Sequence, residues 1–491
     1  MHPRNPYRNP LDFTALSAAY PPLSPHVITN SSSGRKTIDF RNEEAQRRLT
    51  EAIMLRDFGV VLNIPSNRLC PPVPHARINY VLWLQDIVYA HQTILGPSSR
   101  RVRGLDIGTG ATAIYPILAC KSDPSWEMVA TELDDVSYGC ACNNVSSNNM
   151  DVSVKVEKAS VDGPILFPVG KQNFDFSMCN PPFYGSQEEV AQSAESKELP
   201  PNAVCTGAEI EMIFSQGGEE GFVRRMVEES ERLQTRCKWY TSMLGKMSSV
   251  STIVHVLRAR SIMNYAITEF VQGQTRRWAI AWSFSDTHLP DVYPSFLSLA
   301  TFPLITPKQQ TVARISSITP KHALYTLLPP RNTLSQLFPS FSPSKVENAL
   351  FEVLQAIPRV SATITIPTSL PAPSSASAPS TPASGAAKGD SPSTSTSLPV
   401  IFVEAQENTW SRSARRRNQN CQLRKVGDDH DEASVSAKDH SQGHFYPSRG
   451  CEGGVLCSVE CQWIYGSDRG LYESFVGHVG RKVGAALKAG T

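Results

Sequence analysis

The chain has 491 residues, enough for two to three domains at roughly 100 to 200 residues each. Its 47 Lys and Arg residues nearly balance its 45 Asp and Glu residues, so the net charge of +2 does not by itself mark a nucleic-acid binder. The 11 cysteines lack Cys-x-x-Cys spacing, which favours reduced intracellular thiols, and no metal site is predicted. No apolar run approaches the roughly 20 residues that cross a bilayer, so neither secretion nor membrane spanning is expected.

The first 285 residues contain short apolar segments that alternate with helical patterns, including an apolar helix at residues 114–120. An amphipathic helix between the fourth and fifth strands places Phe222 and Met226 near one face. This alternation predicts a doubly wound α/β fold with a mostly parallel sheet, and a turn at Gly273 predicts an antiparallel hairpin at its edge. The predicted strands are residues 102–107, 127–131, 152–156, 174–179, 237–244, 265–271 and 278–284.

The first predicted strand runs into a glycine-rich turn. Gly108, Gly110 and Ala113 follow the strand, and Glu132 ends the next strand about 20 residues later. Glycines at this turn let the backbone approach a ligand, and the acid can hold ribose hydroxyls. The same pattern serves NAD, FAD and S-adenosylmethionine, so it predicts an adenosine-type nucleotide above the strand ends. Asp106, just before the turn, is expected to order the loop by accepting backbone N–H bonds.

The tetrapeptide Asn180-Pro181-Pro182-Phe183 follows the fourth predicted strand. Two prolines cannot continue a central strand, so this motif is expected at the carboxyl edge of the sheet, where open α/β sheets bind ligands. The Asn180 side-chain oxygen and the Pro181 carbonyl could accept both hydrogens of an adenine amino group and aim its nitrogen at a methyl donor. Phe183 could stack on the base. These four residues are the predicted catalytic set.

Beyond residue 285 the composition changes. Residues 367–398 are mostly Pro, Ser, Thr and Ala, which predicts a disordered linker, and residues 427–450 are polar and predict another loop or linker. Strand-like patterns at 400–405 and 454–463 and a helical pattern at 472–487 surround these segments. The sequence therefore predicts a smaller α+β region in the C-terminal part.

The same residues carry a resemblance to a known family. An Asn-Pro-Pro-aromatic motif marks amino-methyltransferases that use S-adenosylmethionine. Residues 1–284 resemble the methyltransferase-like family that makes N6-methyladenosine in U6 small nuclear RNA and is related to the bacterial ribosomal RNA methyltransferase RlmF. The stretches that carry the resemblance are RNPY at Arg4, RLTEAIMLRDFGV at Arg48, RINYVLW at Arg77, GLDIGTGA at Gly104, ATELDD at Ala130, MCNPPFYGSQ at Met178, WYTSMLGK at Trp239 and TEFVQGQTRRWAIAWSF at Thr268.

The resemblance implies a domain organisation and partners. It implies an N-terminal RNA-binding arm with helices at residues 1–70 and a Rossmann-like class I methyltransferase domain at 71–290. Residues 310–366 and 399–491 are expected to form an accessory RNA-binding region, similar to kinase-associated domains. The implied cofactor is S-adenosylmethionine, and the implied partner is structured RNA, U6 small nuclear RNA in particular, with no obligate protein partner. A nuclear location is expected, with a cytoplasmic one also open.

Individual roles also follow from the resemblance. Arg77 is expected to bind the methionine carboxylate of the cofactor, Gly108 and Gly110 to pass beneath it, and Glu132 to hold its ribose. The remaining residues of the implied cofactor site are Asp106, Ser160, beside the adenine ring, and Asn180. The implied RNA-binding residues are Arg4, Arg8, Lys246, Arg277, Arg415, Arg416 and Arg417. The insertion at 187–207 departs from the family because it is acidic.

Two other classes of function remain open at this stage. A protein glutamine methyltransferase uses the same Asn-Pro-Pro-aromatic chemistry on an amide nitrogen, although the basic segments of this chain argue against it. A non-catalytic RNA-binding protein could keep the fold without turnover, although the intact glycine turn and catalytic motif argue for retained chemistry. An NAD oxidoreductase is disfavoured because no residue is evident for hydride transfer.

Overall fold

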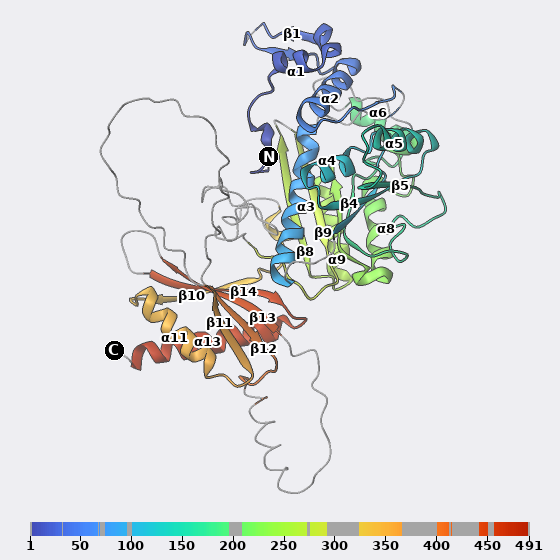
Figure 1. Ribbon diagram of the computed structural model, residues 1–491. Helices are drawn as coiled ribbons and strands as arrows, with labels where there is room; N and C mark the ends of the chain where they lie inside the picture. The colour runs from blue at the N-terminus through green and yellow to red at the C-terminus, as the bar shows by residue number, and fades with distance from the viewer. Residues whose placement is uncertain are drawn as a thin grey trace, which may run out of the picture. The chain divides into compact units, whose positions relative to one another are not determined.

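The computed structural model describes residues 2–31, 33–66, 68, 74–95, 101–195, 209–272, 275–291, 324–365, 400–411, 414, 441–449 and 456–489. These residues form two compact units (Figure 1). The N-terminal unit comprises Met1–Ser285 and Thr311–Pro330, and the C-terminal unit comprises Asp286–Gln310 and Arg331–Thr491. The predicted linker at 367–398, the turn at Gly273 and the basic residues 415–417 lie outside the described residues.

A seven-stranded sheet forms the centre of the N-terminal unit. The pairs among β5, β4, β3, β6 and β7 are parallel, whereas β9 is antiparallel to both β7 and β8. The prediction of a mostly parallel sheet with an antiparallel edge hairpin is therefore confirmed. In spatial order the strands are β5 (Val154–Lys158), β4 (Trp126–Glu132), β3 (Val102–Ile107), β6 (Phe174–Cys179), β7 (Cys237–Leu244), β9 (Thr275–Trp282) and β8 (Tyr265–Gln272).

Two predicted strands of this sheet are shifted along the chain in the structure. The strand expected from residue 152 begins at Val154, because Val152 is 86% exposed and lies in the preceding turn. The last strand begins at Thr275 rather than Trp278, because β9 pairs with β8 along its whole length, down to Thr275 opposite Gln272. In both cases local apolar composition was a weaker determinant than pairing with the neighbouring strand.

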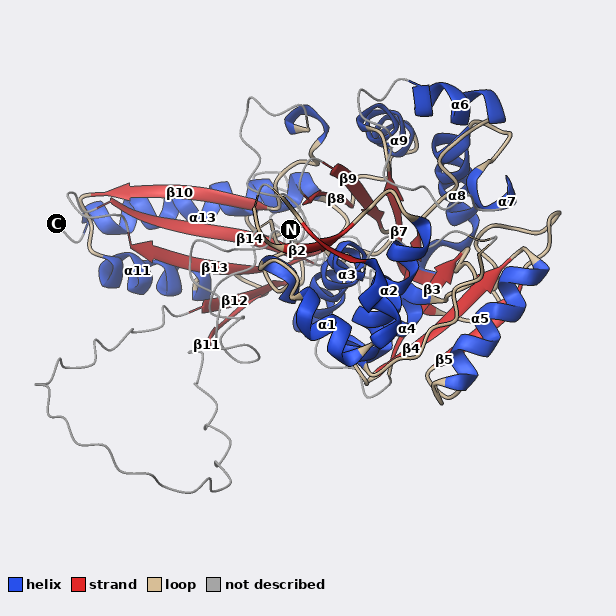
Figure 2. Ribbon diagram, turned by 90° about the horizontal axis from the view of Figure 1, so that it is seen from above, coloured by secondary structure: helices blue, strands red, loops and turns tan. Residues whose placement is uncertain are grey.

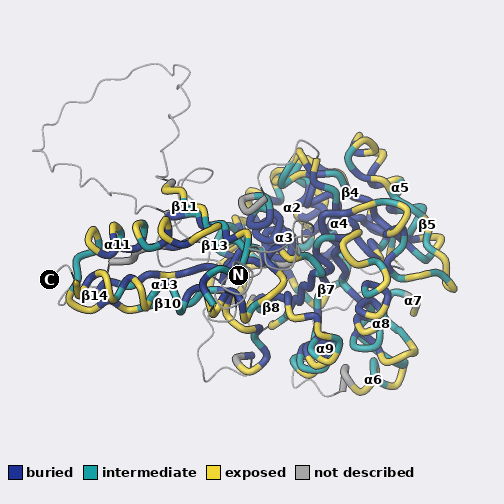
Figure 3. The backbone as a smooth tube through the Cα atoms, turned by 90° about the horizontal axis from the view of Figure 1, so that it is seen from below, coloured by how far each residue is buried: buried dark blue, intermediate teal, exposed yellow. Residues whose placement is uncertain are grey.

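Helices cover both faces of this sheet (Figures 1 and 2). Helices α3 and α4 pack on one face, and α8 and α9 pack together on the other. Burial is deepest along α3, α4 and the central strands, whereas α6 is mostly exposed (Figure 3). The helices of this part are α3 (Pro74–Leu95), α4 (Ile114–Ser122), α5 (Asp135–Ser147), α6 (Gln187–Glu195), α7 (Glu209–Met212), α8 (Gly218–Leu233) and α9 (Met247–Ala259).

A small N-terminal subdomain precedes the sheet and has its own apolar core, which includes Leu16, Leu23 and Leu49. The segment that leaves it is fixed to α5, because Asn144 and Asn148 exchange hydrogen bonds with the backbone of Asn63 and Val61. The main elements of the subdomain are α1 (Phe13–Ala19), β1 (Val27–Thr29), β2 (Lys36–Ile38) and α2 (Glu43–Phe58), with short 3-10 turns at Pro6–Arg8 and Pro21–His26.

The C-terminal unit is a five-stranded antiparallel sheet with helices packed on one face. Helices α11 (Pro343–Gln355) and α13 (Arg469–Ala489) lie side by side against it (Figure 2). This α+β arrangement agrees with the prediction. In spatial order the strands are β10 (Thr333–Pro339), β14 (Leu456–Tyr465), β13 (Ser441–Arg449), β12 (Val400–Ala405) and β11 (Val360–Thr365).

One prediction for this unit was wrong. Residues 441–449 were expected to lie in a polar loop or linker, but they form β13 between β12 and β14. The segment has a mostly polar sequence with Phe445 buried at 2% exposure. Residues 441–445 pair with β12 and residues 442–449 pair with β14, so pairing compensates for a weak apolar pattern.

None of the described helices combines the length and the apolar composition that a membrane crossing requires. The helix α3 is the longest in the N-terminal unit, but its buried residues are core residues of the sheet packing, among them Tyr80, Trp83 and Ile87.

Packing at Gly104 gives a test of the fold. Gly104→Ala should lower the free energy of unfolding by about 1–3 kcal/mol, because a Cβ there would overlap Met128 Sδ and the tip of the buried Phe176 ring. Gly139→Ala is the matched control, since a Cβ in this α5 position meets nothing within 4 Å and should stabilise the helix by roughly 0.5–1 kcal/mol. Urea unfolding measures both. Equal stability of the two variants would contradict the packing described here.

Candidate active site

The glycine turn forms an open backbone surface after β3. Gly108 and Gly110 have φ values of +67° and +68°, in the left-handed region that favours glycine. A Cβ added to either residue would meet nothing within 4 Å, so open space lies next to both. Ala113 also has a positive φ of 47°, and α4 begins at the next residue. The turn therefore leaves room for a ligand to approach the backbone, as its sequence predicts.

The carboxylate of Glu132 holds this turn in place. Its Oε2 accepts the backbone N–H of Gly110 at 2.7 Å, and its Oε1 accepts those of Leu133 and Asp134 at 2.8 and 2.9 Å. Burial raises the pKa of Glu132, while these backbone N–H groups oppose the rise. One side chain thus joins the end of β4 to the glycine turn, and its contact with a ribose stays a prediction.

Asp106 accepts no backbone N–H of the turn, so the prediction that it orders the loop through such bonds was wrong. Neither of its carboxylate oxygens has a hydrogen-bond partner among the described residues, although the side chain is buried. Asp106 lies within β3, one residue before its end, whereas the longer Glu132 side chain reaches the turn from the neighbouring strand. Burial raises the pKa of Asp106 to about 7; Glu132 adds to the rise, and Thr109 and Arg77 oppose it.

Arg77 lies near the start of α3 and contacts Tyr115. Its guanidinium donates to the Tyr115 hydroxyl at 2.9 Å and stands 5.0 Å from the centre of the Tyr115 ring. The charge of Arg77 also lowers the pKa of Asp106. A guanidinium and a buried carboxylate are the groups that suit an amino acid zwitterion, whose carboxylate and ammonium groups need opposite charges.

The catalytic motif leaves the sheet at the same edge. β6 lies next to β3 and ends at Cys179, so Asn180 follows the strand directly, as predicted. Asn180 is half-buried and its amide makes no hydrogen bond within the described part of the chain. Pro181 is buried, and the ring of Phe183 packs so closely on Gly245 that a Cβ there would come within 3.0 Å of it. The motif thus presents one amide and one aromatic ring beside the glycine turn.

A buried acid that the sequence did not single out supports the loop facing the motif. Glu219 is 2% exposed and accepts the backbone N–H groups of Gly245 and Lys246 at 2.6 and 2.9 Å. This contact fixes the loop on which the Phe183 ring rests. Glu219 lies in the first turn of α8, where an acid is common, so the sequence carries no signal that separates it from a solvated residue.

The predicted RNA-binding residues have different surroundings. The guanidinium of Arg277 lies 5.7 Å from the centre of the Phe183 ring, so it is close to the motif. Lys246 forms an ion pair with Glu189 of the acidic insertion. Arg4 is bonded within the protein to Gln85, Leu82 and Asp86, whereas Arg8 is exposed. Arg415, Arg416 and Arg417 lie outside the described residues, and the RNA contacts of all seven stay predictions.

Ser160 lies near the predicted nucleotide position but is exposed. It stands two residues beyond β5, and the preceding Ala159 donates its backbone N–H to the carbonyl of Glu132 at 2.8 Å. The loop is therefore attached to the end of β4. Its contact with an adenine ring remains a prediction.

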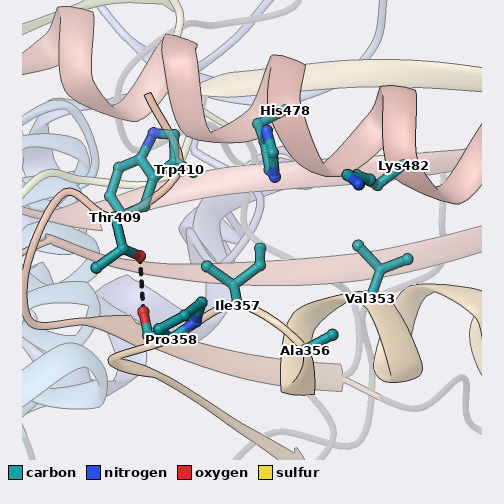
Figure 4. Close-up of a pocket in the computed structure, with 8 residues that line it drawn as sticks. All are labelled: Val353, Ala356, Ile357, Pro358, Thr409, Trp410, His478 and Lys482. Atoms are coloured by element: carbon teal, nitrogen blue, oxygen red, sulfur yellow. Dashed lines mark hydrogen bonds between the residues drawn. The ribbon is translucent and has the colours of Figure 1, made fainter. Parts of the chain in front are cut away.

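A separate cavity of about 220 Å³ lies in the C-terminal unit (Figure 4). Its walls are mostly apolar, and the Thr409 hydroxyl at its edge donates to the Pro358 carbonyl at 2.7 Å. None of the predicted cofactor or catalytic residues lines it. The lining residues are Val353, Ala356, Ile357, Pro358, Thr409, Trp410, His478 and Lys482.

Comparisons with known proteins agree with this geometry. The sequence profile of a family described as RNA methyltransferase matches residues 1–286. The chain is 38% identical over 329 residues to RNA N(6)-adenosine-methyltransferase mettl16 of Danio rerio, covering 65% of this chain and 68% of that protein. It is 39% identical over 280 residues to U6 small nuclear RNA (adenine-(43)-N(6))-methyltransferase of Schizosaccharomyces pombe, covering 56% of this chain and 70% of that protein.

A solved structure extends the comparison to the fold. The hMettl16 catalytic domain in complex with the MAT2A 3'UTR hairpin 1 is similar with a TM-score of 0.52 and 38% identity, covering 58% of this chain and 96% of that one. The chain spans about half the length of the Mus musculus and Homo sapiens relatives that it matches. The similarity therefore concerns the N-terminal unit.

The buried carboxylate of Asp106 predicts a pH dependence of stability. Its pKa of about 7 in the folded protein exceeds the ordinary value of 3.8, so the folded state holds an additional proton between these values. The free energy of unfolding should therefore fall as pH rises from about 4 to about 7, by about 1.4 kcal/mol per pH unit at most. In Asp106→Asn the part of this pH dependence that Asp106 causes should be absent. Urea unfolding between about pH 4 and about pH 7 measures the free energy of unfolding of both proteins. The same pH dependence in the variant and the wild-type chain would contradict the prediction.

The contacts of Glu132 predict a selective loss of cofactor binding. Glu132→Ala should weaken S-adenosylmethionine binding by on the order of a hundredfold, because it removes a charged acceptor and frees the glycine turn. RNA affinity should stay within about twofold. Glu229→Ala is the matched control, since that buried acid accepts the backbone N–H groups of Ile165 and Leu166 instead. Calorimetry with S-adenosylmethionine and with RNA measures both affinities. If Glu132→Ala and Glu229→Ala weakened binding equally, the loss would reflect a general loss of structure.

Proposed function

The chain belongs to the RNA methyltransferase family whose profile matches residues 1–286, and on this premise we propose that it transfers a methyl group from S-adenosylmethionine to the N6 of an adenosine in RNA. The observation that carries this proposal is the meeting of two sites at one sheet edge. β3 leads into the glycine turn, and the neighbouring β6 leads into Asn180. Parallel neighbouring strands end at the same edge, so donor and acceptor would lie next to each other.

The residues of the first site fit S-adenosylmethionine. The buried, unpartnered oxygens of Asp106 suit its ammonium group, and the guanidinium of Arg77 suits its carboxylate. Glu132 would accept from the ribose hydroxyls, and the open turn at Gly108 and Gly110 leaves space for the nucleoside. When bound, S-adenosylmethionine supplies an electrophilic methyl group on a positively charged sulfur.

The second site would orient the acceptor. The lone pair of an adenine amino group is delocalised into the ring, which makes it a poor nucleophile. The Asn180 oxygen and the Pro181 carbonyl would accept its two hydrogens and direct the nitrogen lone pair away from the ring plane. Phe183 would stack on the base, which has to leave its helix to reach this edge. The Arg277 guanidinium lies over the same ring, so an entering base would share or displace that contact.

U6 small nuclear RNA is the substrate we propose. The Schizosaccharomyces pombe relative carries this RNA in its name, and the chain covers 70% of that relative. A structured RNA fits the hairpin bound by the similar hMettl16 domain. A nuclear location would place the enzyme with such a substrate, and the proposed reaction needs no protein partner.

The C-terminal unit would serve as an accessory RNA-binding region. Its sheet and two helices form a separate apolar core, so it can fold without contributing to the sheet edge described above. The cavity near Trp410 lies in this unit and holds none of the catalytic residues. The unit would therefore add RNA affinity while the N-terminal unit carries the chemistry.

The proposed function is tested with purified full-length chain, labelled S-adenosylmethionine and two acceptors. U6 RNA should accept the label at an adenosine, mapped as N6-methyladenosine. A protein with a glutamine acceptor should accept none, which separates this enzyme from a glutamine methyltransferase. Absence of transfer to any RNA, with S-adenosylmethionine bound, would contradict the proposal and favour a non-catalytic RNA-binding protein.

The role of Asn180 makes the test specific. Asn180→Ala should lower turnover on RNA by on the order of a hundredfold or more, because one preorganised acceptor is lost, while S-adenosylmethionine binding stays within a few-fold. Asn173→Ala is the matched control, since Asn173 is exposed at the opposite end of the same strand and should be neutral. Near-normal turnover by a folded Asn180→Ala protein would contradict the assignment.

A further inference from the structure

The last peptide before the catalytic motif pairs with β3 on one side, where Cys179 lies opposite Ile107, and is held by a side chain instead of β7 on the other. The register of β6 with β7 ends at Ser177. Two residues later the backbone N–H of Cys179 donates to the hydroxyl of Tyr80 on α3 at 3.3 Å. Cys179 directly precedes Asn180, so this bond fixes the point at which the chain leaves the sheet.

The Tyr80 hydroxyl belongs to a chain of hydrogen bonds with a defined direction. The Thr241 hydroxyl on β7 donates to the Ser177 carbonyl at 2.7 Å. A hydroxyl carries one hydrogen, so the 2.6 Å contact between Tyr80 and Thr241 requires Tyr80 as the donor. Tyr80 therefore accepts from Cys179 and donates to Thr241. These hydrogen bonds begin at the Cys179 N–H and end at the Ser177 carbonyl, both on β6. They link the end of β6 to the protein beyond the point where its pairing with β7 stops.

These groups are shielded from water. Tyr80 and Cys179 are 1% exposed, and Ser177 and Thr241 are fully buried. Burial raises the pKa of Tyr80 well above its ordinary value, so the hydroxyl keeps its proton. In such surroundings hydrogen bonds are strong and an unpaired polar group is costly. These two effects favour a single arrangement of the hydrogen bonds around Tyr80.

Tyr80 also contacts the donor side of the site. Its ring meets the ring of Tyr115 edge-on, with centres 5.8 Å apart and planes at 88°. The Tyr115 hydroxyl accepts from Arg77, the residue expected to hold the cofactor carboxylate. One buried side chain thus lies between the donor site and the strand that presents Asn180.

We propose that Tyr80 is a positioning residue for methyl transfer, whose hydroxyl holds Asn180 in place through the backbone of Cys179. This inference rests on the proposed function. The hydroxyl is bonded on both sides within the protein, so its role is to set geometry rather than to contact either reactant. Misplacement of a reacting group by a fraction of an ångström lowers turnover more than it lowers binding.

Tyr80→Phe tests the proposal because it removes the hydroxyl and keeps the ring. Turnover should fall on the order of ten- to a hundredfold, while the KM for RNA and the affinity for S-adenosylmethionine stay within about twofold. Tyr240→Phe is the matched control, since that buried hydroxyl donates to the Gln234 carbonyl before β7 begins. A loss of turnover in Tyr80→Phe no larger than that in Tyr240→Phe would overturn the proposal.

Substitutions of Thr241 test the hydrogen-bond chain itself. Thr241→Ser keeps the hydroxyl and should keep turnover within about twofold, whereas Thr241→Val should lower it as Tyr80→Phe does. The double variant Tyr80→Phe with Thr241→Val should be no slower than the slower single variant, because both remove the same chain. Multiplicative losses in the double variant would overturn it.

Hydrogen exchange separates this inference from the proposed function. In Tyr80→Phe the amide of Cys179 should exchange at least tenfold faster than in the wild-type chain, with Tyr240→Phe unchanged at that amide. This result supports the positioning role whether or not RNA is the substrate. A wild-type chain that fails to methylate RNA contradicts the proposed function, and unchanged exchange at Cys179 overturns the role of Tyr80.

Discussion

Two consecutive prolines after β6 are the constraint on which the site depends. Pro181 and Pro182 have no backbone N–H, so the central strand cannot extend beyond Cys179 and the chain must turn out of the sheet. Side chains stabilise the backbone where the strand ends. Tyr80 accepts the N–H of Cys179, the last residue of the strand, and Glu219 fixes the loop that contacts Phe183. The motif is therefore held rigidly at the sheet edge although no strand continues through it.

The neighbouring strands supply the other half of the site under a related constraint. The glycine turn needs positive φ angles and open space above it, so its own side chains cannot brace it. The Glu132 carboxylate braces it from the next strand. Asp106 is buried, and its carboxylate oxygens have no hydrogen-bond partner among the described residues. A buried carboxylate is costly without a partner, and the ammonium group of an amino acid zwitterion would provide one.

Features that depend on neighbouring residues could be predicted from the sequence. Both ends of strand β6 were predicted correctly, because its apolar run and the two prolines that end it act on adjacent positions. Contacts between distant segments were not recoverable. Tyr80 meets Cys179 across 99 positions, and Glu132 reaches Gly110 across 22. Strand β13 was missed because pairing on both edges, not its own composition, stabilises it. The bond between Arg4 and Asp86, 82 residues apart, is another contact that the sequence pattern did not indicate.

The proposed function requires one sheet edge to hold the methyl donor and the target adenine together. A crystal structure of the chain with S-adenosylhomocysteine and an adenosine-containing RNA hairpin would show whether it does. We expect an extruded adenine stacked on Phe183, with its amino nitrogen about 3 Å from both the Asn180 side-chain oxygen and the Pro181 carbonyl. We also expect the homocysteine sulfur on the other side of that nitrogen. An adenine bound elsewhere, or a nucleoside away from Glu132 and the glycine turn, would rule out this arrangement.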